Sequence, residues 1–74
     1  MVNYLEHIEI DTEKRFGQPI IKGTRISVYD ILNFLANGQV IEDILADFPE
    51  LTQGNIKACL AYAADKENRL RVAS

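Results

Sequence analysis

The stretch from Phe16 to Ser27, FGQPIIKGTRIS, limits most strongly what this chain can fold into. Its two glycines and its proline require tight backbone turns, while its isoleucines require burial. A segment that turns and is buried at once is a structured junction rather than a flexible linker. We expect Gly23 to supply a turn with positive φ. The expected core anchors are Ile20, Ile21 and Ile26.

The residues before this junction alternate between apolar and polar side chains. From His7 to Asp11, the alternation puts Ile8 and Ile10 on one face, which is typical of a short half-buried strand. A second extended piece is expected at 19–21, because proline fits the start or the edge of a strand. We therefore predict an N-terminal β element that packs on helices or pairs with another subunit.

Three helices are predicted after the junction. The first runs over 28–36, with Ser27 as its N-cap, Asp30 in its first turn and Gly38 just past its end. Its apolar stripe comprises Val28, Ile31, Leu32 and Leu35. Tyr29 and Phe34 fall off this stripe. They are expected either to offer aromatic surface to a partner or to be wrapped by the N-terminal strand.

The second helix covers 41–47, begins after the poor cap Val40 and is ended by Pro49. The third opens at the N-cap Thr52 and is expected to run to about Arg69. Its predicted inward face comprises Ile56, Cys59, Leu60, Ala63 and Ala64. The fold class is therefore mainly α with a short N-terminal β element. One domain spans 1–74, divided into a strand-and-turn element at 1–26, three helices at 27–70 and a short tail at 71–74.

Composition narrows the class of protein. A chain of 74 residues with 47% hydrophobic residues forms an ordinary but small core, and such domains often gain stability by oligomerising. One cysteine permits no internal disulfide, and neither a long apolar run nor a signal peptide is visible. We therefore expect a cytoplasmic protein that does not enter a membrane.

The net charge of −3 is unevenly distributed along the chain. The segment 28–50 contains acidic residues and no Lys or Arg, whereas basic residues predominate in 13–27 and 51–74. The acidic residues of this middle segment are Asp30, Glu42, Asp43, Asp47 and Glu50. A basic rim of this kind suits phosphate, and it equally describes a normally solvated charged surface.

The second helix, the turn around Pro49 and the third helix have the proportions of a helix-turn-helix, whose second helix reads the major groove. The first turns of the third helix offer side chains that pair with bases or phosphates. These candidate DNA contacts are Thr52, Gln53, Asn55 and Lys57, together with Lys14 and Arg15 at the tip of the polar turn that follows the first strand. An ordinary helical hairpin is the alternative, favoured by the acidic second helix. For Arg25, local pairing with Asp30 or Glu13 and contact with a partner are equally plausible.

Catalytic chemistry has little support in this sequence. His7 is the only histidine, and Cys59 lies on an apolar stripe, so neither a zinc site nor a nucleophilic pair is indicated. The glycines at 17 and 23 are not followed by the Lys-Ser/Thr of a phosphate-binding loop. We expect no enzyme activity, no metal and no cofactor.

The sequence resembles a known family of small proteins over about residues 6–64. The pattern comprises GQPIIKGTRI at 17–26, then Val28, Ile31-Leu32, Gly38, EDIL at 42–45, FPELT at 48–52, Ile56 and ACLAYA at 58–63. This looks like the bacterial and archaeal domain-of-unknown-function family 433, which is grouped with VapB-type antitoxins. The motif positions with structural roles in the family are Gly17, Pro19, Gly23, Thr24, Arg25 and Pro49.

The resemblance implies a homeodomain-like helix-turn-helix that is commonly dimeric and is paired with a PIN-like ribonuclease toxin. By this resemblance, the chain is expected to be a homodimeric antitoxin that binds such a toxin and in addition promoter DNA. The alternative is a protein-interaction or dimerisation module without DNA binding. Two positions depart from the family pattern, Val40 at a cap and Gly54 in place of an acidic residue. No long tail follows the third helix, so a toxin grip by a wrapping tail is not expected.

Overall fold

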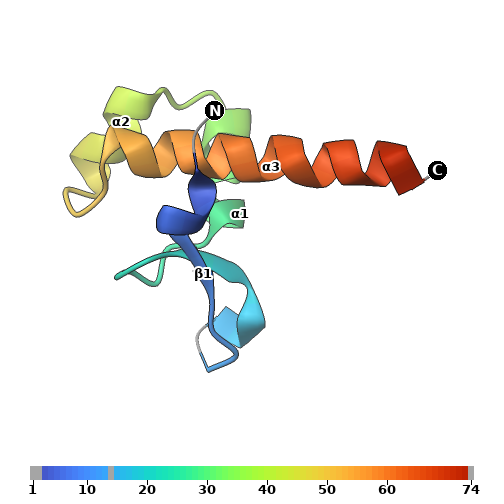
Figure 1. Ribbon diagram of the computed structural model, residues 1–74. Coiled ribbons are helices and arrows are strands. Elements are labelled where there is room, and N and C mark those ends of the chain that lie inside the picture. The colour runs from blue at the N-terminus through green and yellow to red at the C-terminus, as the bar shows by residue number, and fades with distance from the viewer. Residues whose placement is uncertain (1–2, 14, 74) are drawn as a thin grey trace.

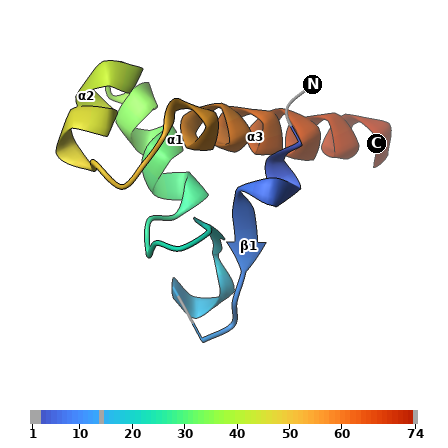
Figure 2. The same ribbon diagram turned by 60° about the vertical axis from the view of Figure 1, so that its left-hand side comes forward.

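The computed structural model describes residues 3–13 and 15–73, and the side chains of residues 3–13 and 16–68. This part of the chain is mainly helical, with three α-helices and one two-stranded antiparallel sheet. Figures 1 and 2 show the long helix α3 lying across the other helices, with the β hairpin extending away from it. In chain order the elements are the 3-10 turn η1 (Tyr4–Glu6), β1 (Ile8–Ile10), the 3-10 turn η2 (Arg15–Gly17), β2 (Pro19–Ile21), α1 (Val28–Ala36), α2 (Ile41–Asp47) and α3 (Gln53–Ala73).

Strands β1 and β2 pair as the alternation predicts, but only one end of the hairpin is buried. Ile8 pairs with Ile21, and both side chains lie in the core. Ile10 pairs with Pro19 and is 63% exposed, so its expected burial is wrong. Because the hairpin projects away from the helices, they cover the Ile8 end and leave the Ile10 end in water (Figure 1).

The turn after β2 folds back onto the strand that precedes it. Gly23 has φ +80, as predicted for this position. The hydroxyl of Thr24 donates to the carbonyl of Ile21 at 2.9 Å and accepts from the backbone N–H of Ile26 at 3.0 Å. The backbone N–H of Ile21 in turn donates to the carbonyl of Ile26 at 2.9 Å. The chain thus leaves the sheet and reaches α1 through a closed, hydrogen-bonded loop.

Helix α1 has the bounds and the cap that the sequence predicts. The Ser27 hydroxyl accepts from the N–H of Asp30 at 2.9 Å, and the Asp30 carboxylate accepts from the N–H of Ser27 at 3.2 Å. This reciprocal capping box satisfies two N–H groups that the helix itself leaves unpaired. Ser27 is fully buried, so the box lies inside the fold.

Helix α2 also has its predicted bounds, but only one of the two hydrogen bonds of a capping box is present at its start. Val40 has no side-chain oxygen, and only the Asp43 carboxylate contributes, accepting from the N–H of Val40 at 3.3 Å. After the helix, the ring of Phe48 stacks on that of Phe34 from α1, with centroids 5.7 Å apart. Phe34, which falls off the apolar stripe of α1, is therefore partly buried by the end of α2.

Helix α3 is longer than predicted and turns a different face inward. It continues to Ala73, so residues 71–73, expected as a tail, belong to the helix. Leu60 is 44% exposed and Ala64 is also exposed, whereas Ala58 is buried with Ile56 and Cys59. The N-terminal segment explains the difference, because η1 packs on α3 and adds a second covered side to this helix.

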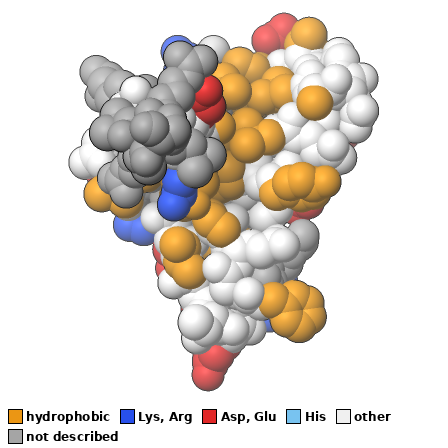
Figure 3. Space-filling model, turned by 90° about the vertical axis from the view of Figure 1, so that its right-hand side faces the viewer, with side chains coloured by type: hydrophobic (Ala, Val, Ile, Leu, Met, Phe, Trp, Pro, Cys, Tyr) orange, Lys and Arg blue, Asp and Glu red, His pale blue; other side chains and the backbone are white. Residues whose placement is uncertain are grey.

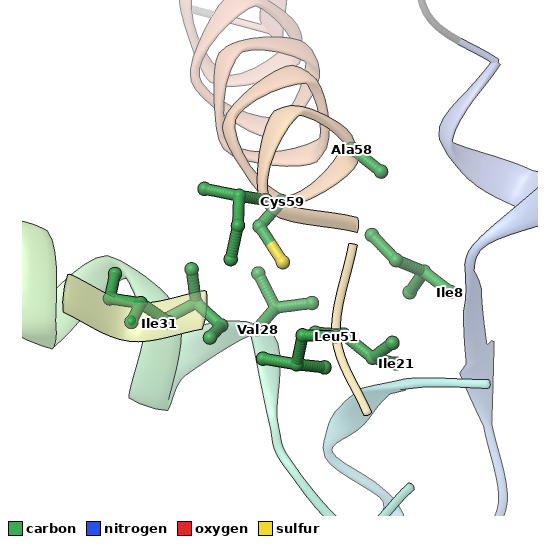
Figure 4. Close-up of a cluster of buried hydrophobic side chains, with 9 residues drawn as sticks. Ile8, Ile21, Val28, Ile31, Leu51, Ala58 and Cys59 are labelled. Carbon is green, nitrogen blue, oxygen red and sulfur yellow. The ribbon is translucent and has the colours of Figure 1, made fainter. Parts of the chain in front are cut away.

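The buried side chains form one cluster between the hairpin and the three helices. Figure 4 shows Ile8 and Ile21 from the hairpin facing Val28 and Ile31 from α1 and Cys59 from α3. Leu51, Ile44, Ile56 and Ala58 complete this cluster, and Ile20 is also fully buried. Among the described helices, none has the length and apolar character needed to span a membrane.

Candidate functional site

The start of α3 holds the four residues that the sequence singles out as base or phosphate contacts. Thr52 and Asn55 form a second capping box, in which the Thr52 hydroxyl accepts from the N–H of Asn55 at 3.1 Å and the Asn55 amide oxygen accepts from the N–H of Thr52 at 2.9 Å. Their hydrogen-bonding groups are therefore used to begin the helix. Thr52 is exposed and Asn55 is half-buried.

His7 packs against this turn. The sequence does not indicate it as a site residue, because a lone histidine has no recognisable partner there. The amide nitrogen of Asn55 lies 3.0 Å from Nδ1 of His7. A Cβ built on Gly54 would lie 3.3 Å from Cε1 of the same ring. The glycine thus leaves room for the imidazole against the first turn of α3, and no local pattern in the sequence indicates this contact between distant segments.

Unlike Thr52 and Asn55, Gln53 and Lys57 take no part in the capping box, and both of their side chains are exposed. Being four residues apart, they lie on the same face of α3 on successive turns. Both can donate hydrogen bonds near the start of the helix. The amide of Gln53 can pair with adenine, and the ammonium group of Lys57 can pair with guanine or phosphate. The structure therefore brings together Thr52, Gln53, Asn55 and Lys57, and leaves Gln53 and Lys57 as the pair that reaches outward.

Of the other two proposed DNA contacts, the structure describes only the backbone of Arg15, which belongs to η2. Lys14 is outside the described residues, and so is the side chain of Arg15. Figures 1 and 2 show the hairpin tip well away from the start of α3. The backbone around η2 and the start of α3 are thus two separate regions of the fold.

The residues of the family motif have structural positions. Gly17 and Gly23 both have φ +80, Pro19 begins β2, and Thr24 closes the turn described above. Pro49 follows α2 directly in the exposed turn before α3. Arg25 is exposed and makes an interaction within the chain.

An acidic surface surrounds α2. All of its carboxylate side chains and that of the following turn are exposed, and no Lys or Arg occurs between Arg25 and Lys57. We call this the acidic face, and it comprises Glu42, Asp43, Asp47 and Glu50. Since α2 is the helix that would cross the DNA backbone in a helix-turn-helix, these charges oppose phosphate at that place.

Apolar groups are exposed on another side of the molecule. A groove with a volume of about 270 Å³ lies between β2, α1 and α3, and we call it the apolar groove. It is lined by Gln18, Pro19, Val28, Tyr29, Leu32 and Tyr62. Figure 3 shows a patch of hydrophobic side chains on one face of the molecule, with further hydrophobic side chains standing out below it.

The described residues include neither a nucleophilic thiol nor a cluster of metal ligands. Burial raises the pKa of the Cys59 thiol to about 11, so the thiol stays protonated near neutral pH and is a poor nucleophile. Among the residues that the structure describes, no group of three or more His, Cys, Asp or Glu side chains is placed to hold a metal ion.

Comparison with known proteins places this fold in a family. A family model described as "Protein of unknown function (DUF433)" matches residues 8–63, from β1 into α3. The chain belongs to this family. A DUF433 relative, "Uncharacterized protein y4eO" of Sinorhizobium fredii (strain NBRC 101917 / NGR234), is 36% identical over 47 residues. The match covers 64% of this chain and 21% of y4eO, so the DUF433 chain spans about a fifth of that relative's length. No solved structure matches the chain.

Proposed function

We propose that this DUF433 protein is an antitoxin-like binding protein without catalytic activity, and that it binds a PIN-like ribonuclease through the acidic face. The observation that carries the proposal is the exposure of every carboxylate of that face, within a stretch of sequence free of Lys and Arg. The homeodomain-like helix-turn-helix that the resemblance implies supplies the scaffold, with α2 and α3 as its two helices.

Charge complementarity supports this partner class. A ribonuclease must attract the RNA backbone, and basic side chains supply most of that attraction. A neutralising protein that presents clustered carboxylates competes for the same basic surface and is steered toward it. Because α2 is held by a stacked aromatic pair and a buried Ile44, its carboxylates are presented on a fixed scaffold.

The decisive experiment pairs the protein with the PIN-like ribonuclease encoded beside its own gene. We expect Asp47→Lys to weaken binding at least tenfold at low salt and to reduce the salt dependence of the association rate. Glu13→Lys is the matched control, because it makes the same charge change on an exposed residue near the hairpin tip. Equal affinities for both variants, or the lack of such a neighbouring ribonuclease, would count against the proposal.

A second candidate function is promoter binding by α3, favoured by the outward-facing Gln53 and Lys57. Affinity for a duplex carrying the protein's own promoter should fall steeply between 50 and 200 mM salt, by at least about tenfold for a few phosphate contacts. Lys57→Ala should make that dependence shallower, while Lys66→Ala, an exposed lysine further along α3, is the control. If the protein does not bind the duplex at low salt, it is better described as a protein-interaction module without DNA binding.

The protein is also proposed to be a homodimer. The chain is small, its core cluster is limited to a few side chains from each element, and several large apolar side chains are exposed. Domains of this size frequently complete their stability by association.

A further inference from the structure

Phe16 combines two features that a monomer does not explain. Its side chain is fully exposed, and its backbone has φ 58 and ψ 34, the left-handed region that disfavours bulky residues. Both the solvated ring and the backbone are therefore unfavourable in the isolated chain. A strained, exposed aromatic residue at a hairpin tip is typical of a group held ready for contact with another molecule.

The apolar groove is the complementary feature on the same chain. Its volume of about 270 Å³ is sufficient for a phenyl ring, and its lining contains no charged side chain. Gln18 and the hydroxyl groups of Tyr29 and Tyr62 supply the polar groups of the lining. The groove thus fits an apolar, uncharged group and offers no charged partner to a phosphate or to a charged peptide side chain.

We propose that Phe16 of one copy inserts into the apolar groove of a second copy, and that the second copy returns the same contact. In a two-fold dimer, each contact between one residue and another occurs twice with the roles exchanged. Phe16 lies two residues before Gln18, which lines the groove, so the backbone that carries the ring is close to the groove of its own copy. One two-fold axis near the hairpin can therefore satisfy both contacts at once.

The available apolar surface is adequate for such a dimer. Tyr29 lines the groove and is 67% exposed, and Ile10 of the same hairpin is 63% exposed. Burying Phe16 and Tyr29 from both copies removes roughly 600 Å² from water. The groove walls and the exposed Ile10 side chains of both copies add to this area, which thereby approaches the roughly 1,000 Å² of a specific interface. This assignment rests on the proposed homodimer, and it is independent of toxin and DNA binding.

The chain contains no tryptophan, so Phe16→Trp creates a single reporter at the contact. We expect its fluorescence emission to shift to shorter wavelength as protein concentration rises through the dimer dissociation constant. Adding Tyr29→Arg, which places a charge in the groove at an exposed position, should abolish that shift. A tryptophan that remains fully solvated while the protein dimerises would overturn the assignment.

Sedimentation equilibrium of the Phe16→Gly variant is a second test, and it measures dimerisation in a variant that should still fold. Glycine relieves the positive φ, so this variant should fold at least as well as the wild-type chain while its dimer dissociation constant rises at least tenfold. Val40→Ser, which removes an exposed apolar side chain at the start of α2, should leave dimerisation unchanged. A wild-type chain that is monomeric at all concentrations refutes the homodimer itself. A wild-type dimer that Phe16→Gly leaves intact refutes only the contact between Phe16 and the groove.

Discussion

The two complete capping boxes of this protein, Ser27 with Asp30 and Thr52 with Asn55, differ in their access to water. In both, a hydroxyl accepts from the N–H three residues later, at 2.9 Å for Ser27 and 3.1 Å for Thr52. Ser27 is fully buried and Thr52 is exposed. Replacing each hydroxyl by alanine removes the same bond, but only the N–H near Thr52 can be hydrated afterwards.

The expected cost follows from this difference. Loss of an N-cap hydrogen bond costs about 1 kcal/mol, and this is what we expect for Thr52→Ala. For Ser27→Ala, the N–H of Asp30 loses its acceptor beside a buried side chain, and the space left by one oxygen is too small for water. The unsatisfied donor adds roughly 1 kcal/mol, so the total is about 2 kcal/mol. In a domain of this size that lowers the melting temperature by about 10 °C.

Urea unfolding followed by circular dichroism measures both variants on one scale. Neither substitution alters the backbone contact between Ser27 and Ile20, so the comparison isolates the hydroxyl groups. If Ser27→Ala costs no more than Thr52→Ala, then burial does not decide the strength of these caps and the reasoning is wrong.

Three further substitutions test other parts of the fold. Val40→Ser supplies the missing half of the α2 cap opposite Asp43 and should stabilise the protein by about 0.5–1 kcal/mol in the same urea assay. Gly54→Ala should leave the free energy of unfolding of the wild-type chain nearly unchanged, because its gain in helix propensity is offset by the contact with the His7 ring. In a His7→Ala background, the same substitution should stabilise the protein by about 1 kcal/mol. Equal effects in both backgrounds would exclude the steric explanation. Burial raises the pKa of the Cys59 thiol from 9.0 to about 11, so the unfolded chain loses its proton first and stability falls as pH rises from 9 to 11. Against a Cys59→Ala control, unfolding curves should show this loss reaching about 2 kcal/mol by pH 11.

Both ends of α1 and α2 and the start of α3 could be predicted because the signals that set them are local. A hydroxyl cap at Ser27, a glycine with positive φ at Gly38 and a proline after Phe48 act on their immediate neighbours, whatever the rest of the chain does. The start of α3 at Thr52 belongs to the same class. These predictions are confirmed to the residue.

The inward face of α3 could not be predicted, because it depends on what packs against the helix. Helical periodicity places Leu60 and Ala64 with Ile56, but the N-terminal turn covers another side, where Tyr4 packs edge-on against Tyr62 at 5.4 Å. The contact between His7 and Asn55 joins residues 48 positions apart, which no local pattern encodes. The exposure and positive φ of Phe16 likewise have no local signal in the sequence, because bulky residues rarely adopt this backbone conformation.

The long separations between the N-terminal segment and α3 have a consequence for synthesis in the cell. His7 meets Asn55, and the Tyr4 hydroxyl donates to the carboxylate of Asp65, 61 residues later. At about 5–20 residues per second, a ribosome takes several seconds to make this interval, whereas a hairpin closes in about 1–10 μs. Until α3 emerges, Ile8 therefore lacks the side chains with which that helix covers it, although β2 and α1 have already been made. During that wait the nascent hairpin is exposed to chaperones and to neighbouring chains.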